Sequence, residues 1–330
     1  MLSEDDLIAK YFAPIAGPAG LGLRDDAAAF TPAPGHDVVV TTDAIVAGVH
    51  FLADDVSDDI ARKALRVNLS DLAAKGAAPL GFVLALALPA GTNAEWLAGF
   101  AAGLGEDAAH FGLPLIGGDT VKTPGPLTIS VTALGQVPQG RMVRRTGAEP
   151  GDILYVSGTI GDAALGLRLR LGEKRDAFWQ GRLAPAARDF LVARFLRPQP
   201  RMALAASLLE NAHGAMDVSD GLVGDLTKML KVSGLGANVR LDQIPLSSSA
   251  RAAIALVPEL FETALTGGDD YEILCSVAPA RVSAFEAGAA AANVAVTRIG
   301  VADSSGGRAA VFLDASGKPR HFVQDSYSHF

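Results

Sequence analysis

The sequence has almost no cysteine and lacks the common nucleotide-binding signatures. Cys275 is the single cysteine among 330 residues, which excludes an intramolecular disulfide and a metal site built from several thiolates. No GxxxxGK[ST] segment is present, so the chain is not a P-loop enzyme, and the HRD and DFG motifs of protein kinases are missing too. Any nucleotide site in this chain must therefore use another architecture.

Long hydrophobic runs and excess positive charge are also missing. The longest apolar stretch, residues 80–90, is shorter than the about 20 residues that a membrane-spanning helix needs. The N-terminal segment MLSEDDLIAKYF has early acidic residues and no apolar signal core. Lysine and arginine total 28 against 36 aspartates and glutamates, a formal net charge of -8, which disfavours nucleic acid and anionic membranes as partners. We expect a soluble cytoplasmic protein.

What is present is enough apolar sequence for two folded domains. Hydrophobic residues make up 49% and charged residues 19% of a 330-residue chain, a length that fits two domains of similar size. Prolines, glycines and arginines cluster near residues 138–152, which predicts a boundary between a domain over 1–140 and a domain over 141–330. Strand-like and helix-like segments mix in both halves, so the fold class is α/β or α+β.

The periodic segments predict individual elements. We expect helices over 4–12, 58–76, 93–111 and 162–171, and strands over 82–89, 127–137 and 152–158. The β-branched run at 37–42 predicts a strand that ends at Asp43, and LPLIGGDT (113–120) predicts a strand that runs into a glycine loop. The segment 82–89 is apolar on both faces, which indicates a strand buried in the chain or covered by a partner subunit. Cys275 lies in an apolar run and is expected to be a buried core thiol.

The informative pattern is the position of the aspartates. Each of a set of seven lies where an apolar element meets a turn that contains Gly, Ser or Thr: Asp26, Asp43, Asp71, Asp119, Asp217, Asp220 and Asp269. Carboxylates gathered in one site repel one another unless cations neutralise them, and Mg²⁺ accepts carboxylate and phosphate oxygens together. The pattern therefore indicates a magnesium site that takes a phosphorylated ligand.

Each of these residues also has an ordinary structural interpretation. Aspartate commonly caps helices and braces turns, and Asp71, which follows Asn68-Leu69-Ser70, suits a first-turn position. The pairs Gly117-Gly118 and Gly267-Gly268 could approach a phosphate closely or could form plain turns. His50 could be structural, and Arg145 could bind phosphate oxygens or be a solvated linker charge.

Seven segments resemble the thiamine-monophosphate kinase family, in its order and approximate spacing. They are GLRDDAAAF, VVVTTDAIVAGVHF, VNLSDLAAKGA, LIGGDT, RRTGAEPGD, MDVSDGL and GGDDYE, and the resemblance covers nearly the whole chain. The resemblance implies a two-domain architecture like that of aminoimidazole ribonucleotide synthetase. In it, the N-terminal domain forms a homodimer through a β-barrel-like interface and the C-terminal α/β domain completes the active site.

The resemblance also implies an activity and a set of site residues. The activity is ATP-dependent phosphorylation of thiamine monophosphate to thiamine diphosphate with several Mg²⁺ ions, by direct in-line transfer, in thiamine diphosphate biosynthesis. The implied metal ligands are Asp26, Thr41, Thr42, Asp43, Asp71, Asp119, Asp217 and Asp220. The implied ATP contacts are Gly118, Asp119, Arg145 and Ser219, and the implied thiamine phosphate contacts are His50, Asp269 and Tyr327.

Three positions depart from the family pattern. Arg24 stands where the family usually has glycine, and Asp269 stands where it has glutamate. His110 stands near the position of a tyrosine beside the ATP base, and we do not assign it as the adenine contact. The alternatives at this stage are another ATP-dependent synthetase of the same superfamily, a metal-dependent phosphatase, and a non-catalytic nucleotide-binding module.

Overall fold

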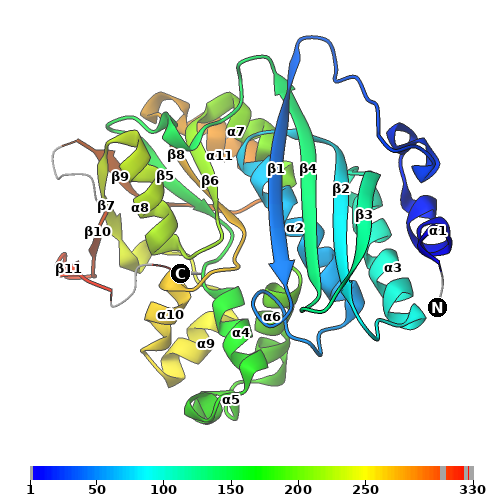
Figure 1. The fold of residues 1–330 in the computed structure, drawn as a ribbon. Helices are drawn as coiled ribbons and strands as arrows, with labels where there is room; N and C mark the ends of the chain where they lie inside the picture. The colour runs from blue at the N-terminus through cyan, green and yellow to red at the C-terminus, as the bar shows by residue number, and fades with distance from the viewer. Residues whose placement is uncertain (1–2, 305–309, 323–325, 327–330) are drawn as a thin grey trace. The chain divides into compact units, whose positions relative to one another are not determined.

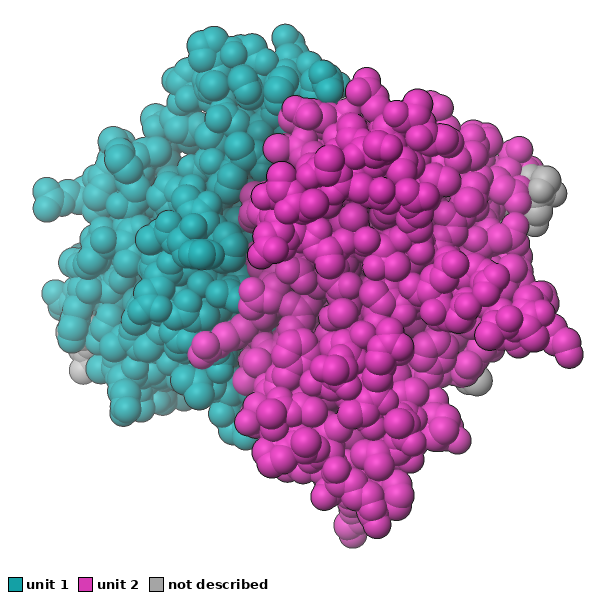
Figure 2. Space-filling view, turned by 180° about the vertical axis from the view of Figure 1, so that it is seen from behind, with its two compact units in different colours: residues 1–72, 77–142 teal, residues 73–76, 143–330 magenta. Residues whose placement is uncertain are grey.

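A computed structural model describes residues 3–304, 310–322 and 326. The chain divides into two compact units, one formed by residues 1–72 and 77–142 and the other by residues 73–76 and 143–330 (Figure 2). Both units mix helices with a sheet, so the predicted α/β fold class is confirmed. Within the described residues, no helix is long and apolar enough to cross a membrane.

The first unit is a four-stranded sheet with helices on one face (Figure 1). Its strands are β1 (His36–Val46), β2 (Ala78–Pro89), β3 (Leu115–Thr123) and β4 (Thr128–Pro138), in the order β1-β4-β2-β3. Its helices are α1 (Glu4–Leu7), which continues as a π-helical turn over Ile8–Phe12, α2 (Ser57–Ala74) and α3 (Ala94–Phe111). The last two residues of α2 belong to the second unit.

The two faces of this sheet differ in burial. Alternate residues such as Ile45, Leu86 and Ile129 are buried on the face that α2 and α3 cover. The alternation predicts that the intervening residues point the other way, and Val40 is 60% exposed and Val83 36% exposed. Among the described residues, the segment 82–89 is therefore not buried on both faces, and the second face of the sheet is left uncovered.

The second unit is built on a seven-stranded sheet in the order β11-β10-β7-β9-β5-β8-β6. The strands are β5 (Ile153–Ser157), β6 (Ala212–Val218), β7 (Gly236–Arg240), β8 (Glu272–Val277), β9 (Val296–Asp303), β10 (Ala310–Leu313) and β11 (Pro319–Arg320). The helices are α4 (Asp162–Leu171), α5 (Ala177–Gln180), α6 (Pro185–Leu196), α7 (Ala205–Asn211), α8 (Leu222–Ser233), α9 (Ser248–Leu256), α10 (Leu260–Thr266) and α11 (Val282–Ala291). All neighbouring strands are antiparallel except β7 and β10.

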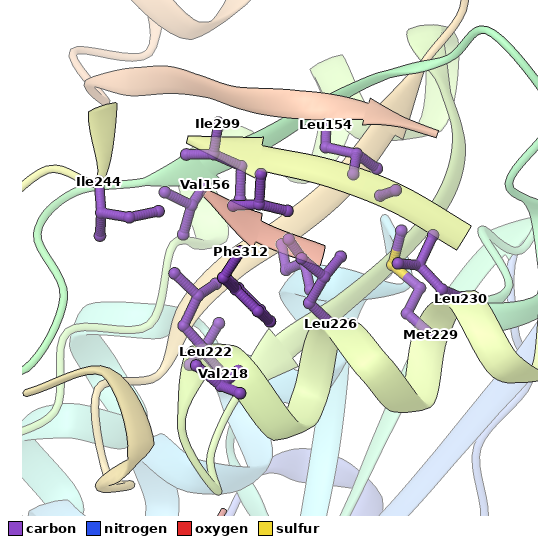
Figure 3. Packing of buried hydrophobic residues seen from close by; sticks show 14 of the residues in the cluster. Leu154, Val156, Val218, Leu222, Leu226, Met229, Leu230, Ile244, Ile299 and Phe312 are labelled. Atoms are coloured by element: carbon purple, nitrogen blue, oxygen red, sulfur yellow. The ribbon is translucent and has the colours of Figure 1, made fainter. Parts of the chain in front are cut away.

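Helix α8 is fixed to this sheet by one apolar face. Leu222, Leu226 and Met229 are fully or almost fully buried in a cluster with residues of β5, β9 and β10 (Figure 3). Burial of each such side chain stabilises the fold by about 1.5–3 kcal/mol. Cys275 of β8 is buried in a separate hydrophobic cluster, as expected, and burial raises the pKa of its thiol. The α8 helix is thus a firm base for the loop that precedes it.

Candidate functional site

In the first unit, helix α2 holds the carboxylate-bearing end of strand β1. The Thr41 hydroxyl donates to Asp71 Oδ2 at 2.5 Å, and the Asp43 backbone N–H donates to Asn68 Oδ1 at 3.1 Å. Asn68 is fully buried and also donates to the Ala64 carbonyl oxygen, which fixes the orientation of its amide. Asp43 and Asp71 therefore come from two rigid elements that are hydrogen-bonded to each other.

Two expectations about these aspartates are wrong. Strand β1 does not end at Asp43 but continues to Val46, because its pairing with β4 extends over residues 43–46. Asp71 is in the last turns of α2 rather than at a helix start, so it does not cap that helix. Both carboxylates belong to regular elements, which aim them more firmly than loops do.

Thr42 points away from the Asp43 carboxylate. Successive strand residues face opposite sides of a sheet, and the Thr42 hydroxyl lies 3.0 Å from the Thr132 hydroxyl on β4. If Thr42 and Asp43 bind the same metal ion, Thr42 must coordinate it through its backbone carbonyl oxygen.

His50 lies in the turn that follows β1. Its Nδ1 accepts the backbone N–H of Val46 at 3.1 Å, and the buried Lys63 donates to its carbonyl oxygen at 2.8 Å. A ring nitrogen that accepts an N–H carries no proton, so the neutral ring has its proton on Nε2. This arrangement makes His50 a hydrogen-bond donor through Nε2.

Asp26, Gly118 and Asp119 line one pocket at the β3 edge of the sheet. The pocket has a volume of about 460 Å³, and its lining also includes Asp25 and the apolar Phe12. The segment before Asp26 is fastened to β3, because Gly17 N–H donates to the Leu115 carbonyl oxygen at 2.7 Å. The structure thus brings together three residues from two of the motifs.

Gly117 and Gly118 are not in a loop, which corrects the expectation for LPLIGGDT. Both lie inside β3, which pairs in parallel with β2 and continues to Thr123. A Cβ atom at Gly118 would lie 2.2 Å from the Leu84 carbonyl oxygen, so only glycine fits this close approach of the two strands.

At Arg24, where the family has glycine, the backbone conformation is one that any residue can adopt. Its φ is -109°, a value open to any residue, whereas the preceding Leu21 and Leu23 have φ of 52° and 54°. The exchange of glycine for arginine therefore does not strain this turn.

The two carboxylate groups of the first unit lie at opposite edges of its sheet. Strands β1 and β3 are separated by β4 and β2, and three strand spacings amount to about 14 Å. One metal ion cannot bridge Asp43 and Asp119 of the same chain over that distance.

In the second unit, Asp217, Ser219 and Asp220 lie where β6 leads into α8. Asp217 is the next-to-last residue of β6 and is mostly buried, and Ser219 and Asp220 form the turn that follows. Asp225 Oδ2 accepts the backbone N–H groups of Ser219 at 3.0 Å and Asp220 at 2.8 Å. The two side chains of the turn are therefore carried on a fixed backbone.

The loop that contains Asp269 is joined to this turn. Asp269 N–H donates to the Ser219 carbonyl oxygen, and Tyr271 N–H donates to that of Val218, both at 2.8 Å. Asp269 has a φ of 71°, in the left-handed region, which aspartate adopts more readily than most residues with a side chain. The shorter side chain at this position therefore suits the backbone, and the Ser219 turn and the Asp269 loop share one hydrogen-bonded framework.

Two acidic residues after Asp269 anchor its loop. Asp270 is buried and accepts the backbone N–H groups of Gly161 and Ala163 at the start of α4. Burial raises the pKa of its carboxyl well above the usual range, although these N–H groups act in the opposite direction. Glu272 has no exposed surface and binds Arg194, Arg201 and the Ser157 hydroxyl.

The remaining predicted residues do not join these groups. Arg145 is exposed, and its carbonyl oxygen lies near Ser233 at the C-terminal end of α8, whereas Ser219 precedes the helix start. The 12-residue helix is about 18 Å long, so the backbones of Arg145 and Ser219 are well separated. His110 is exposed near the end of α3, and Tyr327 lies outside the described residues.

The candidate ligand atoms are of the type that Mg²⁺ prefers, but within the described residues they do not by themselves complete a metal site. They are carboxylate, hydroxyl and carbonyl oxygens, which are the ligands that Mg²⁺ prefers. Within the ranges that the structure describes, no three His, Cys, Asp or Glu side chains are grouped closely enough to hold a metal by themselves. Phosphate oxygens would have to complete the coordination.

Several supporting residues were missed in the sequence, among them Asn68, Asp225, Asp270 and Glu272. Asp225 alone had a local signal, because an acidic residue in the first turn of a helix commonly binds the N–H groups there. The others depend on partners distant in the sequence, such as Glu272 and Arg201, which are 71 residues apart.

Comparisons with known proteins match both halves of the chain to one family. Residues 24–137 match the model of the AIR synthase related protein N-terminal domain, and residues 149–312 match that of its C-terminal domain. The thiamine-monophosphate kinase of Caulobacter vibrioides is 46% identical over 90% of this chain and 83% of that protein.

Two solved structures extend the similarity. The crystal structure of thiamine-monophosphate kinase from Stenotrophomonas maltophilia is 39% identical, with a TM-score of 0.79 over 90% of this chain and 91% of that one. A structure described as AaThiL complexed with AMPPCP and TMP is 28% identical, with a TM-score of 0.77 over 99% of this chain and 94% of that one. This chain therefore belongs to the AIR synthase related proteins and, within them, to the thiamine-monophosphate kinase family.

Proposed function

We propose that this chain transfers the γ-phosphoryl group of ATP to thiamine monophosphate, which yields thiamine diphosphate and ADP. The observation that carries the proposal is the relative that was solved with AMPPCP and TMP, whose fold matches over 99% of this chain. The enzyme class is a phosphotransferase with a phosphate group as acceptor.

ATP and Mg²⁺ are assigned to the aspartate-bearing elements. Asp26, Asp43, Asp71, Asp119, Asp217 and Asp220, with oxygens of Thr41 and Thr42, would hold several Mg²⁺ ions, while Gly118, Arg145 and Ser219 contact the nucleotide. Bound Mg²⁺ would neutralise the negative charges of the phosphate groups. The rigid setting of Asp43, through Asn68, and of Asp71, through Thr41, supports this role because both carboxylates are positioned in advance.

The acceptor phosphate is assigned to His50, Asp269 and Tyr327. The hydrogen bond from Val46 N–H to His50 Nδ1 leaves Nε2 as the proton-bearing nitrogen, which suits donation to a phosphate oxygen. The hydrogen bond between Asp269 and Ser219 supports a common framework for acceptor and nucleotide. Holding two anionic reactants in line is most of what phosphoryl transfer requires of a protein.

The transfer is direct, without a phosphorylated enzyme. A covalent route needs an activated nucleophile, and the only thiol of the chain, Cys275, is buried in β8 with a raised pKa. In the direct route that we propose, the oxygen of the acceptor phosphate attacks the γ-phosphorus itself, and ADP leaves from the opposite side.

The N-terminal domain also forms the homodimer, through the uncovered face of its sheet. This face carries Val38, Val40, Val83 and Val121, which are 36–60% exposed, together with small residues of β2 and β4. An exposed apolar sheet face of this kind marks an interaction surface. A second copy of the chain that packs against it would give the β-barrel-like interface, and the C-terminal domain would complete the active site.

Each active site then draws on both copies. The Asp43 and Asp119 groups are three strands apart in one chain, about 14 Å, which is too far for shared metal ions. In a symmetric dimer the β1 edge of one sheet can face the β3 edge of the other, which would join the two groups.

A coupled assay of ADP release tests the function. ADP formation should require thiamine monophosphate and Mg²⁺, and Asp43→Asn should reduce the rate at least about 100-fold without loss of fold. Asp37→Asn is the matched control, because Asp37 lies on the same strand and accepts only the Gly140 N–H among the hydrogen bonds described for it. A rate of ADP release that does not depend on thiamine monophosphate would refute the proposal.

Mixing two inactive variants tests the shared site. Asp43→Asn and Asp119→Asn subunits, mixed under exchange conditions, form mixed dimers that contain one intact site, so about 25% of the normal activity should return. No recovery after verified subunit exchange would show that both groups serve within one chain.

A further inference from the structure

The turn that carries Ser219 and Asp220 depends on one buried carboxylate. Asp225, in the first turn of α8, is 1% exposed, and a single oxygen of it, Oδ2, accepts two consecutive backbone N–H groups, from Ser219 and Asp220. Its other oxygen accepts Lys228 Nζ at 3.0 Å. The apolar face of α8 fastens the helix to the sheet independently of these contacts (Figure 3).

The same turn supports the neighbouring loop. The Ser219 carbonyl oxygen receives the Asp269 N–H, and a Cβ atom at Gly268 would lie 2.2 Å from that oxygen. Lys228 also binds the Asp220 carboxylate at 2.5 Å, so the side chain of Asp220 is held as well as its backbone. A movement of the turn would therefore displace Asp269 together with Ser219 and Asp220.

We infer that Asp225 is a positioning residue, whose carboxylate sets the backbone of the Ser219–Asp220 turn and, through it, the Asp269 loop. The role in catalysis rests on the proposed function, whereas the role in ordering the two loops does not. Asp225 acts through other residues and does not itself contact either substrate.

Two substitutions separate this role from general stability. Asp225→Ala removes the acceptor of both N–H groups. Asp225→Asn can place its amide oxygen where Oδ2 lies and keep both bonds, although an NH2 group then replaces the oxygen that accepts the hydrogen bond from Lys228 Nζ. The control is Asp152→Ala, because Asp152 is similarly buried and binds the Glu149 N–H and His213, at the opposite end of β6 from the Ser219–Asp220 turn.

Hydrogen exchange and kinetics supply the readouts. Asp225→Ala should speed backbone exchange at least about 10-fold in peptides that cover 217–222 and 266–271, and should raise the KM for ATP more than it lowers kcat. Asp225→Asn should stay much closer to wild type in both measurements. Asp152→Ala should lower the denaturation midpoint but leave the exchange of these peptides and the KM unchanged.

Failure of the positioning role and failure of the proposed function give different results. If Asp225→Ala leaves exchange in both loops unchanged, or if Asp225→Asn matches Asp225→Ala, the positioning role is wrong. A folded wild-type protein that does not turn over thiamine monophosphate refutes the proposed function instead, while the exchange comparison still decides the structural part.

Discussion

Replacing Glu272 with glutamine should weaken the second unit more than any change of a surface charge. Glu272 is completely buried, and its carboxylate lies 2.8 Å from Arg194 Nη2 and 2.6 Å from Arg201 Nε, with a further bond from the Ser157 hydroxyl. Glutamine has nearly the same shape but no charge, so the substitution leaves two largely buried guanidinium groups without their counter-charge.

The magnitude follows from that loss. Removing one partner of a buried ion pair costs about 3–5 kcal/mol, because the remaining charge stays desolvated. With a urea m-value of about 2–3 kcal/mol/M, the midpoint of unfolding should fall by about 1–2.5 M. The control is Glu173→Gln, since Glu173 pairs with Arg175 at 2.5 Å but both side chains are exposed, and such a pair contributes about 0–1 kcal/mol.

Tryptophan fluorescence can report on this unit alone. The chain has two tryptophans, Trp96 in the first unit and Trp179 in the second, where Trp179 is buried against Asp176. In a Trp96→Phe background, urea unfolding is followed through Trp179. A midpoint for Glu272→Gln within error of that for Glu173→Gln would refute the assignment of Glu272 as an essential counter-charge.

Three further predictions follow from other parts of the fold. Asn68→Ala should destabilise the first unit by about 2–3 kcal/mol in urea unfolding, because one buried and one partly buried hydrogen bond are lost, and should lower kcat/KM at least about 10-fold through Asp43; an unchanged kcat/KM would contradict this. Asp270 has a raised pKa in the folded state, so its stabilising contribution is complete below the unfolded pKa of about 3.9 and is lost as pH rises through the folded value, at up to about 1.4 kcal/mol per pH unit. Asp270→Asn should therefore become more stable relative to wild type as the pH rises above about 4, and a constant difference in the free energy of unfolding would show otherwise. Sedimentation at low micromolar concentration should give twice the 33.9 kDa chain mass for wild type and a monomer for Val40→Asp, which places a charge on the uncovered face; a wild-type monomer would contradict the proposed dimer.

The elements with strong periodicity were predictable from the sequence. The expected helix over 162–171 matches α4 (Asp162–Leu171), and the expected strand over 127–137 matches β4 (Thr128–Pro138) within one residue. The glycine pair 117–118 misled the prediction because consecutive glycines usually mark a turn, and only the position of the Leu84 carbonyl oxygen explains them inside a strand.

The candidate residues could be named from the sequence, but their arrangement could not. No local pattern indicates that β4 and β2 lie between the strands of Asp43 and Asp119, since strand order depends on tertiary packing. The alternation of β2 was masked because both of its faces are apolar, and the exposure of Val83 and Ala85 in the folded chain distinguishes the uncovered face from the covered one.

The transfer of labelled phosphate tests the central claim most directly. With γ-labelled ATP, Mg²⁺ and thiamine monophosphate, the label should appear in thiamine diphosphate in a one-to-one ratio with ADP, and denatured protein from a mixture without thiamine monophosphate should carry none. Label released as inorganic phosphate, or retained on the protein in stoichiometric and chemically competent form, would contradict direct phosphorylation of thiamine monophosphate.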